Sequence, residues 1–251
     1  MKTLRTFIIP LVLLLAWQIL ANSGLVSNYL LPKPLAVWNT AIAAWHSGLL
    51  TDHISASLYR IALGFSLSAL IGFLIAGLVS RFSSIQEILS VPLAFARMIP
   101  PLAMIPLLII WLGIGGVTQI TIIIFAAFFP IFLSTRDGLC RVSEAHVELA
   151  RSLHLSQWVY VTRIAIPSAV PSIITGLRMA FGYSWRALVG AELIAASIGL
   201  GYMIMDSQEM QRTDEVIVGI CVIGVLGWIL DTLFSKGICF FLHRRFPEIA
   251  E

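Results

Sequence analysis

MIPPLAMIPLLIIWLGIGGVTQITIIIFAAFFPIFLST, residues 98 to 135, contains no Asp, Glu, Lys or Arg. A helix needs roughly 20 apolar residues to cross the hydrocarbon core of a membrane, so this stretch is long enough for two spans. The sequence GIGG, Gly113 to Gly116, is expected to separate them, because glycine is unfavourable inside a helix and common in turns. The stretch therefore predicts two membrane-spanning helices joined by a short connection.

The rest of the chain repeats this apolar pattern. Two more windows without charged residues, Thr6 to Pro32 and Ile61 to Ser80, supply one span each. Apolar runs near 167–196 and 216–242 add two further spans. The chain is 59% hydrophobic and 12% charged, whereas soluble domains average about 25% charged residues. We therefore expect an all-α integral membrane protein with six transmembrane helices, folded as one domain over residues 1–251.

The positions of the basic residues predict how the chain is oriented. With the N terminus inside, ten of them fall on or near the cytoplasmic side: Lys2, Arg5, Arg81, Arg136, Arg141, Arg151, Arg163, Lys236, Arg244 and Arg245. Three fall outside: Lys33, Arg60 and Arg212. An excess of Lys and Arg in cytoplasmic loops is typical of membrane proteins. We expect a multi-pass protein of a bacterial inner membrane with both termini in the cytoplasm.

Two alternatives concern the charge and the N terminus. The net charge of +3 is compatible with nucleic-acid binding, but the basic residues follow the membrane topology, so no nucleic-acid partner is expected. The first 23 residues are compatible with a cleavable signal peptide. The uncharged stretch there is longer than the apolar region of a signal peptide, which favours a retained helix.

The segment from about 141 to 166 interrupts the apolar pattern with a polar, helix-like sequence. Its spacings of three and four residues produce one polar and one apolar helical face. The polar face carries Arg141, Glu144, Glu148 and Arg151. Ser156 is expected to cap a second short helix, QWVYVTRIAI, which Pro167 terminates or redirects. We expect the two short helices to form an elbow on the cytoplasmic side.

The elbow has two interpretations. It is compatible with a helix that only lies on the lipid headgroups. Its exposed face carries acids as well as bases, which anionic lipid does not favour, and a plain connection needs only a few residues. We favour a docking element for a soluble partner.

Four prolines mark the third span. Pro92, Pro100, Pro101 and Pro106 lie within 15 residues. Proline removes a helix hydrogen bond and clashes with the preceding turn, so this span is expected to be kinked. In a membrane, such breaks persist where protein or a water-filled cavity satisfies the freed backbone groups. The span is either a bent structural helix or the lining of a translocation pathway.

Span five carries three charged residues, Arg178, Arg186 and Glu192. If the span crosses from about 174 to 195, Arg178 reaches the inner surface and Glu192 the outer one. Arg186 is then left near the midplane, where an arginine costs roughly 2.5 to 3.5 kcal/mol. Arg186 therefore needs a partner.

Two hypotheses provide that partner. Arg186, together with Arg97, is a counter-charge for an anionic solute, or it forms a structural ion pair, with Asp231 of span six as a candidate. Ser184 and Trp185 are also placed to line a pore, although an aromatic side chain in a membrane helix more often serves packing. The candidate translocation residues are Arg97, Pro100, Ser184, Trp185, Arg186 and Glu192.

EAHVELARSLHLSQWVYVTRIAIP, residues 144 to 167, resembles the EAA signature of ABC importer permeases. That signature is Glu-Ala-Ala, a glycine after three residues, nine residues and Ile-x-Leu-Pro. The residues in register are Glu148, Ala150, Ile164 and Pro167. Leu149 takes the second alanine position and Ile166 the leucine position, while His154 takes the glycine position. His is among the non-glycine residues better tolerated at positive φ.

The resemblance extends over nearly the whole chain. SLYRIALGFSLSALIG, IPPLAMIPLLIIWLGIG and GLRMAFGYSWRALVGAELIAA are all similar to the nitrate, sulfonate and bicarbonate group of these permeases. Within that group the chain looks most like the alkanesulfonate and taurine branch. The resemblance implies an aliphatic sulfonate or taurine as the solute, with nitrate, bicarbonate, a thiamine pyrimidine precursor and riboflavin as alternatives.

The resemblance also implies a fold and partners. The fold is that of a type I ABC importer permease with cytoplasmic coupling helices. The implied assembly contains a homodimer of permease subunits, a cytoplasmic dimer of ATP-binding subunits and an extracytoplasmic solute-binding protein. The coupling residues are Glu144, Glu148, Ala150, Arg151, His154, Ile164 and Pro167. ATP and magnesium belong to the partner, since this chain has no GxxxxGK[ST] phosphate loop, and the chain itself is expected to bind no cofactor.

Other classes of protein fit the sequence less well. An ion-coupled secondary transporter usually has about twice this length and an internal inverted repeat, which is not evident here. An intramembrane enzyme is not supported, because the sequence has neither HExxH nor a serine elbow. The three cysteines have no metal-ligand spacing. We therefore expect no catalytic or metal-binding residues.

Overall fold

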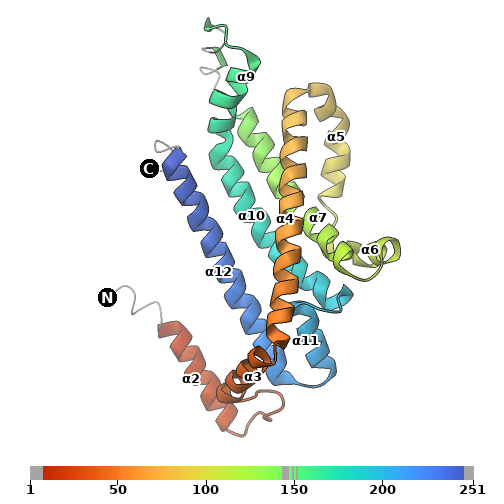
Figure 1. Cartoon of the computed structure of the whole chain (residues 1–251), viewed down its shortest axis with the longest axis vertical. Helices are drawn as coiled ribbons and strands as arrows, with labels where there is room; N and C mark the ends of the chain where they lie inside the picture. The colour runs from red at the N-terminus through yellow and green to blue at the C-terminus, as the bar shows by residue number, and fades with distance from the viewer. Residues whose placement is uncertain (1–7, 143–146, 149, 151, 246–251) are drawn as a thin grey trace.

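The computed structural model describes residues 8–142, 147, 148, 150 and 152–245. Every regular element in this part of the chain is helical, and the long helices run roughly along the long axis of the molecule (Figure 1). The elements are α2 (Ile8–Asn22), α3 (Pro34–His46), α4 (Leu49–Arg81), α5 (Ser83–Ala96), η1 (Pro101–Met104), α6 (Ile105–Leu112), α7 (Gly116–Cys140), α9 (Gln157–Tyr160), η2 (Val161–Ala165), α10 (Ile166–Ala195), α11 (Leu200–Glu209) and α12 (Thr213–Arg245).

Four helical segments in the described part are long and apolar enough to cross a membrane. They are Leu49–Arg81, Gly116–Cys140, Gln157–Ala195 and Thr213–Gly237. A fifth results if α5 and the η1–α6 segment count as one bent span. The 15 residues of α2 extend about 22 Å, which is less than the roughly 30 Å of a hydrocarbon core. The all-α membrane fold is thus confirmed, with four to five candidate spans where six were expected.

The connection at GIGG forms as predicted. Gly113 and Gly115 have φ values of 79° and 149°, a region that glycine enters without the steric cost of a side chain. The Thr118 hydroxyl donates a hydrogen bond to the Gly113 carbonyl oxygen at 2.6 Å. The apolar stretch is therefore divided just before α7 begins at Gly116.

The proline-rich segment bends more than expected. Between α5 and the η1–α6 segment the chain turns by 86°, so the predicted kink is confirmed and amounts to a break between two helices. The backbone at Pro100 is extended, and Pro101 begins η1, since a residue that precedes proline is disfavoured in the helical region. Pro92, by contrast, lies inside α5 without ending it.

Pro167 does not end the helix that carries it. The segment Gln157–Ala195 is continuous, and the five residues of η2 form a π-helical turn within it. The Ile166 amide donates to the Val161 carbonyl oxygen, five residues back. This wider turn absorbs the missing amide and the ring of the proline that follows. The predicted second helix of the elbow, α9 and η2, is therefore the first part of the continuous helix Gln157–Ala195.

Small residues bring α4, α7 and α10 together at the centre of the molecule. A methyl group on Gly64 would lie 2.8 Å from Ile123, and one on Gly72 would lie 2.9 Å from Ile131. On α10, Gly176 is in equally close contact with Ser134 of α7. Close approach through small residues is typical of membrane helices, which lack a hydrophobic driving force for association. These three helices form the scaffold on which the charged side chains are placed.

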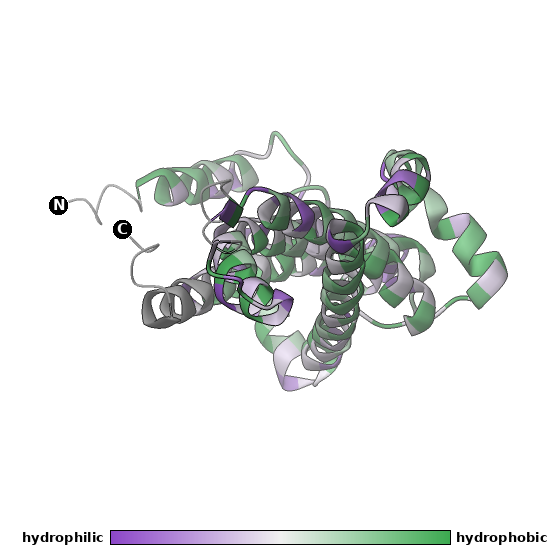
Figure 2. Cartoon of the chain, turned by 90° about the horizontal axis from the view of Figure 1, so that it is seen from above, coloured by the Kyte–Doolittle hydropathy of each residue, from purple (hydrophilic) through white to green (hydrophobic). Residues whose placement is uncertain are grey.

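Apolar residues dominate the outside of the helices. Seen along the long axis, the peripheral helices are mainly hydrophobic, and polar residues gather on the connections and on a few inner faces (Figure 2). Trp38 and Trp45 of α3 are exposed, as expected for a helix at the membrane interface. The Trp17 indole nitrogen donates to the Pro32 carbonyl oxygen at 3.0 Å and ties α2 to the start of α3.

Candidate functional site

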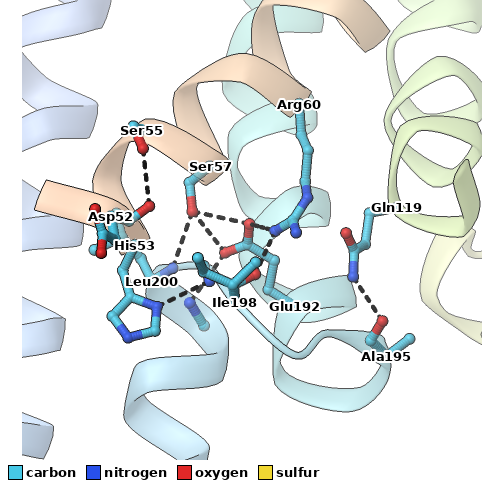
Figure 3. Close-up of polar contacts among 12 residues, drawn as sticks. Asp52, His53, Ser55, Ser57, Arg60, Gln119, Glu192, Ala195, Ile198 and Leu200 are labelled. Atoms are coloured by element: carbon cyan, nitrogen blue, oxygen red, sulfur yellow. Dashed lines mark hydrogen bonds and ion pairs between the residues drawn. The ribbon is translucent and has the colours of Figure 1, made fainter. Parts of the chain in front are cut away.

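A buried ion pair joins α4 and α10 at the end of the molecule near α11 (Figure 3). Arg60 Nη1 lies 2.7 Å from Glu192 Oε1, and the two residues are 7% and 1% exposed. The same Arg60 nitrogen donates to the Ile198 carbonyl oxygen at 2.6 Å. Ser57 donates its hydroxyl hydrogen to the Glu192 carboxylate. Each charge is thus paired and hydrogen-bonded, which is the condition for tolerating it in an apolar interior.

This network also fixes the start of α11. The Gly201 amide donates to Glu192 Oε2 at 3.0 Å, and the Leu200 amide donates to Ser57 Oγ at 2.9 Å. The Gly199 amide donates to His53 Nδ1 at 3.0 Å. A carboxylate at a helix N terminus also interacts favourably with the helix dipole. The loop from 196 to 199 is therefore held on α4 by its own backbone groups.

The prediction that Glu192 reaches the outer surface is wrong, because its side chain is buried and paired with Arg60. The assignment of Arg60 to the outer side of the membrane stays a prediction. The Glu192 prediction treated the charge as if it sought water, but the two charges satisfy one another across helices. The sequence contains a signal for this that was missed. His53, Ser57 and Arg60 are spaced by four and three residues and so share one face of α4.

Outside the spans, α11 carries a second hydrogen-bonded pair. The Tyr202 hydroxyl donates to Asp206 Oδ1 at 3.2 Å. The negative charge of Asp206 raises the pKa of Tyr202. The phenol therefore remains a hydrogen-bond donor at neutral pH. Because the two residues are four apart, one helical turn, their hydrogen bond stabilises the short helix α11.

Arg97 and Arg186 line one cavity, here called the Arg97 cavity. Its volume is about 340 Å³, and its wall includes Pro101, Phe129 and Tyr183. Both arginine residues are exposed in the chain, although they come from different elements. None of the described residues that line this cavity is Asp or Glu. Two guanidinium groups without a carboxylate make it suited to an anion, because guanidinium forms strong, directional hydrogen bonds to oxyanions.

Arg186 also lines a second cavity, here called the Asp231 cavity. This cavity lies between α10 and α12, has a volume of about 450 Å³ and is lined by Arg178 and Asp231 as well. Arg186 and Asp231 form no ion pair in the structure, although both side chains are described. The proposed structural pair is thus absent in this conformation, while its members face the same space.

The remaining candidate pathway residues are distributed unevenly. Pro100 is exposed at the bend before η1. Ser184 is fully buried and donates to the Ala180 carbonyl oxygen of its own helix at 2.7 Å. Trp185 is largely buried in the core and lines the Asp231 cavity with one edge. Ser184 therefore differs from the prediction, because its hydroxyl faces the helix backbone and neither of the two cavities.

The elbow is only partly described, since Glu144 and Arg151 lie outside the described residues. Glu148 is helical and exposed, whereas Ala150 is buried. Ile164 lies in the π-helical turn and Pro167 directly after it. Ser156 caps the following helix as predicted, accepting a hydrogen bond from the Val159 amide at 3.4 Å.

His154 takes the conformation that a glycine would take. Its φ is 48°, and the Leu155 amide donates to the Ala150 carbonyl oxygen at 3.0 Å. This bond and the left-handed residue before it match the Schellman motif that commonly ends helices. The turn between the two parts of the elbow therefore forms without a glycine.

A third cavity separates the base of the elbow from the helix scaffold. It has a volume of about 740 Å³ and lies among α4, α7 and the first part of the long α10 helix. Arg81 Nη2 donates to Gln157 Oε1 at 2.9 Å across its edge. The elbow is thus connected to the end of α4 by a polar contact and is separated from the core by space.

Comparison with known proteins places the chain among transport proteins. A family model described as "Binding-protein-dependent transport system inner membrane component" matches residues 68–245. The putative aliphatic sulfonates transport permease SsuC of Bacillus subtilis is 36% identical over 91% of this chain and 83% of its own length. The taurine transport system permease TauC of Escherichia coli is 35% identical over 88% and 82%. The nitrate import permease NrtB of Synechocystis is 34% identical over 93% and 87%.

Solved structures share the fold. A chain in the crystal structure of an amino acid ABC transporter with histidines has a TM-score of 0.64 and 18% identity, covering 80% of this chain and 96% of that one. A chain of the methionine ABC transporter MetNI in inward-facing conformations has a TM-score of 0.59 and 15% identity, covering 72% and 92%. At these identities the similarity concerns the fold alone.

Proposed function

The chain belongs to the family of binding-protein-dependent transport system inner membrane components and is an ABC importer permease, and from this we propose that it imports an aliphatic sulfonate or taurine. Members of this family are non-catalytic subunits. The relatives named for sulfonates and taurine, at 36% and 35% identity, support this solute class. A sulfonate is a permanent anion at physiological pH, which links the solute to the charges of the pathway.

The observation that carries the proposal is the Arg97 cavity. Two exposed arginines face the same volume without a carboxylate among its lining residues. A neutral solute would leave both charges without a function, whereas a sulfonate accepts hydrogen bonds from both guanidinium groups. Phe129 and Pro101 give the same cavity an apolar wall for a short alkyl chain.

Replacement of Arg186 tests this role. We expect Arg186→Met to abolish sulfonate uptake while the complex is still expressed and assembled, because an unpaired exposed arginine contributes no ion pair to the fold. Arg212→Gln is the matched control, since Arg212 belongs to an exposed pair with Glu215. A misassembled complex with Arg186→Met would instead make Arg186 a structural residue.

We propose an assembly of two copies of this chain, two cytoplasmic ATP-binding subunits and an extracytoplasmic solute-binding protein. In this assembly the uncharged segment from Thr6 to Pro32, which contains α2, contributes the sixth span, and both termini lie on the cytoplasmic side of the inner membrane. The excess of basic residues at the end of the molecule that carries α9 supports this orientation. ATP and magnesium are used by the partner.

The elbow is proposed to be the docking element for the ATP-binding subunit. Its coupling residues are Glu144, Glu148, Ala150, Arg151, His154, Ile164 and Pro167. Glu148 is exposed and Ala150 is buried, so the helix has one side free for a partner and one side packed. Closure of the ATP-binding subunits would move the elbow and, through the continuous helix from 157 to 195, the candidate pathway residues of α10.

A charge reversal tests the docking. We expect Glu148→Arg to abolish uptake while the permease itself still inserts in the membrane, because an exposed residue tolerates substitution in the fold. Co-purification of the ATP-binding subunit with the variant measures the docking directly. Normal transport by Glu148→Arg would refute the assignment.

Nitrate is a second candidate solute. The nitrate import permease of Synechocystis is almost as similar to this chain as the sulfonate permeases are. Nitrate is also an oxyanion and would satisfy the same pair of arginines. The apolar wall of the cavity favours a solute with an alkyl part.

A further inference from the structure

Arg186 lies on the boundary between two cavities. It lines the Arg97 cavity on one side and the Asp231 cavity on the other, and Tyr183 lines both as well. The Arg186 guanidinium carbon is 6.0 Å from the centre of the Tyr183 ring. A cation–π contact of this kind contributes only about 0.5–1 kcal/mol at an exposed site. Arg186 therefore borders both cavities, and its guanidinium is held only by a weak contact with Tyr183.

Asp231 is an isolated charge in an apolar helix. Between Glu215 and Lys236, α12 contains no other charged residue. Ionisable residues within membrane spans usually face the bundle interior or a water-filled cavity and have a partner there. The cavity that Asp231 lines contains Arg178 and Arg186, and neither is ion-paired with it. Asp231 thus has two cationic neighbours that line the same cavity and, among the described residues, no ion-pair partner in this conformation.

Two glycines shape the space between these charges. Gly182 lies between Arg178 and Arg186 on one face of α10, and a methyl group there would meet no atom within 4 Å. On α12, one turn before Asp231, a methyl group on Gly227 would lie 2.7 Å from Trp185 Nε1. Trp185 therefore packs closely against α12, while the wall beside Gly182 is left open. The side chain of Arg186 has room to move on the side of Asp231.

We propose that Asp231 is the resident counter-ion of Arg186 and competes with the transported anion for it, an inference that rests on the proposed import of an anion. The two groups are not paired in this conformation; in another conformation of the transport cycle, before solute binds, the Asp231 carboxylate attracts Arg186 into the Asp231 cavity. An anion in the Arg97 cavity draws Arg186 to the other side. Because the carboxylate remains available, the bound anion is released more easily.

This competition gives Asp231 a role in turnover. A transport site must bind its solute firmly enough to accept it and weakly enough to release it. Arg97 and Arg186 alone would bind an oxyanion through two charge-assisted contacts and retain it. A competing carboxylate on the neighbouring helix lowers that affinity without removing either arginine. Asp231 is in this sense a positioning residue that acts through Arg186.

The test compares three variants of the assembled importer in proteoliposomes. For Asp231→Asn we expect the KM for taurine to fall about fivefold, within the usual range of coupling between sites, and Vmax to fall as release slows. Asp231→Glu keeps the charge and should retain wild-type kinetics. Glu87→Gln, which removes an exposed carboxylate on α5 away from all cavities described above, is the control. Equilibrium binding of labelled taurine to the purified complex gives the affinity independently of transport.

The outcomes separate this inference from the proposed function. A lower KM with a lower Vmax, or tighter equilibrium binding, in Asp231→Asn supports the competition. Unchanged kinetics and affinity in Asp231→Asn, when wild type imports taurine, would overturn it and leave anion import intact. If Asp231→Asn does not assemble but Asp231→Glu does, Asp231 is structural and the inference fails. If the wild-type importer accepts only neutral solutes, the proposed anion import itself fails.

Discussion

The buried pair of Arg60 and Glu192 holds α4, α10 and the start of α11 together. Replacing Arg60 with Met leaves the Glu192 carboxylate buried and without its cation, which is expected to cost about 3–5 kcal/mol of stability. The midpoint of thermal unfolding of the purified complex measures this loss. Arg212→Gln removes an exposed ion pair, in which the side chains are 58% and 21% exposed, and should lower the midpoint only slightly. Equal effects of the two substitutions would contradict the assignment.

His154 presents a second test at the level of a single residue. A non-glycine residue in the left-handed region costs about 1–2 kcal/mol. His154→Gly removes this cost, but only part of it appears as added stability, because glycine also increases the conformational entropy of the unfolded chain. We expect this variant to transport normally, with equal or slightly higher thermal stability. His154→Val should lose both stability and uptake, because a β-branched residue is disfavoured at positive φ. Full activity of the valine variant would show that the turn is not needed.

The sequence predicted single residues well where the local backbone determines them. The cap at Ser156 follows from short-range geometry, which residue type and spacing report. The positive φ at His154 was suggested only by the resemblance, in which His154 takes the glycine position of the EAA signature. The sequence did not predict the Arg60–Glu192 pair, because its members are 132 residues apart and only the packing of α4 against α10 brings them together. From the sequence alone, an arginine or glutamate near a helix end can equally be exposed to water or paired with a residue far along the chain.

At the scale of the element, the π-helical turn before Pro167 sets the rotation of the elbow about the α10 axis. Without the proline ring, the segment Val161–Ala165 can return to regular α-helix. The elbow would then rotate by about 100°, the angle of one residue. We expect Pro167→Ala to lower uptake strongly, with basal ATP hydrolysis by the partner retained. Pro171→Ala, which lies deeper in the same helix, is the comparison.

The opposite result is equally specific. If Pro167→Ala transports like wild type, the orientation of the elbow does not depend on the π-helical turn. A loss of uptake in both proline variants would indicate a general effect on α10 instead. The experiment therefore assigns the effect to the elbow only when Pro167→Ala alone fails.

Helix periodicity and apolar length predicted most elements, but not how prolines act in them. Pro92, Pro167 and Pro171 are accommodated inside helices, whereas Pro100 and Pro101 produce a bend of 86°. Two adjacent prolines leave two consecutive amides without hydrogen, so the backbone there cannot continue a helix. A single proline needs only a widened turn. Whether a proline bends the helix or is accommodated in it depends on the conformation of the neighbouring backbone, which the number and positions of prolines in the sequence do not give.

At the scale of the whole molecule, Cys140 tests the orientation. Cys140 is exposed at the end of α7, which lies in the cytoplasm in the proposed orientation. In a variant with Cys221→Ser and Cys239→Ser, a membrane-impermeant maleimide should label Cys140 in inside-out vesicles and leave it unlabelled in intact cells. Further replacement of Cys140 by Ser is the background control. Labelling from the outside of intact cells would reverse the proposed topology.

The membrane class followed from composition alone, because a chain this apolar exposes too few charges for a water-soluble surface. The number of spans followed less securely. The described part of α2 is too short to cross by itself, and the third span is a bent segment. A hydropathy window counts apolar residues along the sequence, whereas crossing a membrane requires a distance along the membrane normal. The two lengths differ wherever the chain turns.

The central claim is that this permease imports an anion. The most direct measurement is uptake of a labelled panel (taurine, an alkanesulfonate, nitrate, a hydroxymethylpyrimidine and riboflavin) in a strain that lacks the gene and in the same strain complemented with it. We expect complementation to restore uptake of taurine or the alkanesulfonate and to leave uptake of the neutral solutes unchanged. Restored uptake of a neutral solute, without any anion, would refute the import of an anion and leave Arg97 and Arg186 without the role proposed for them.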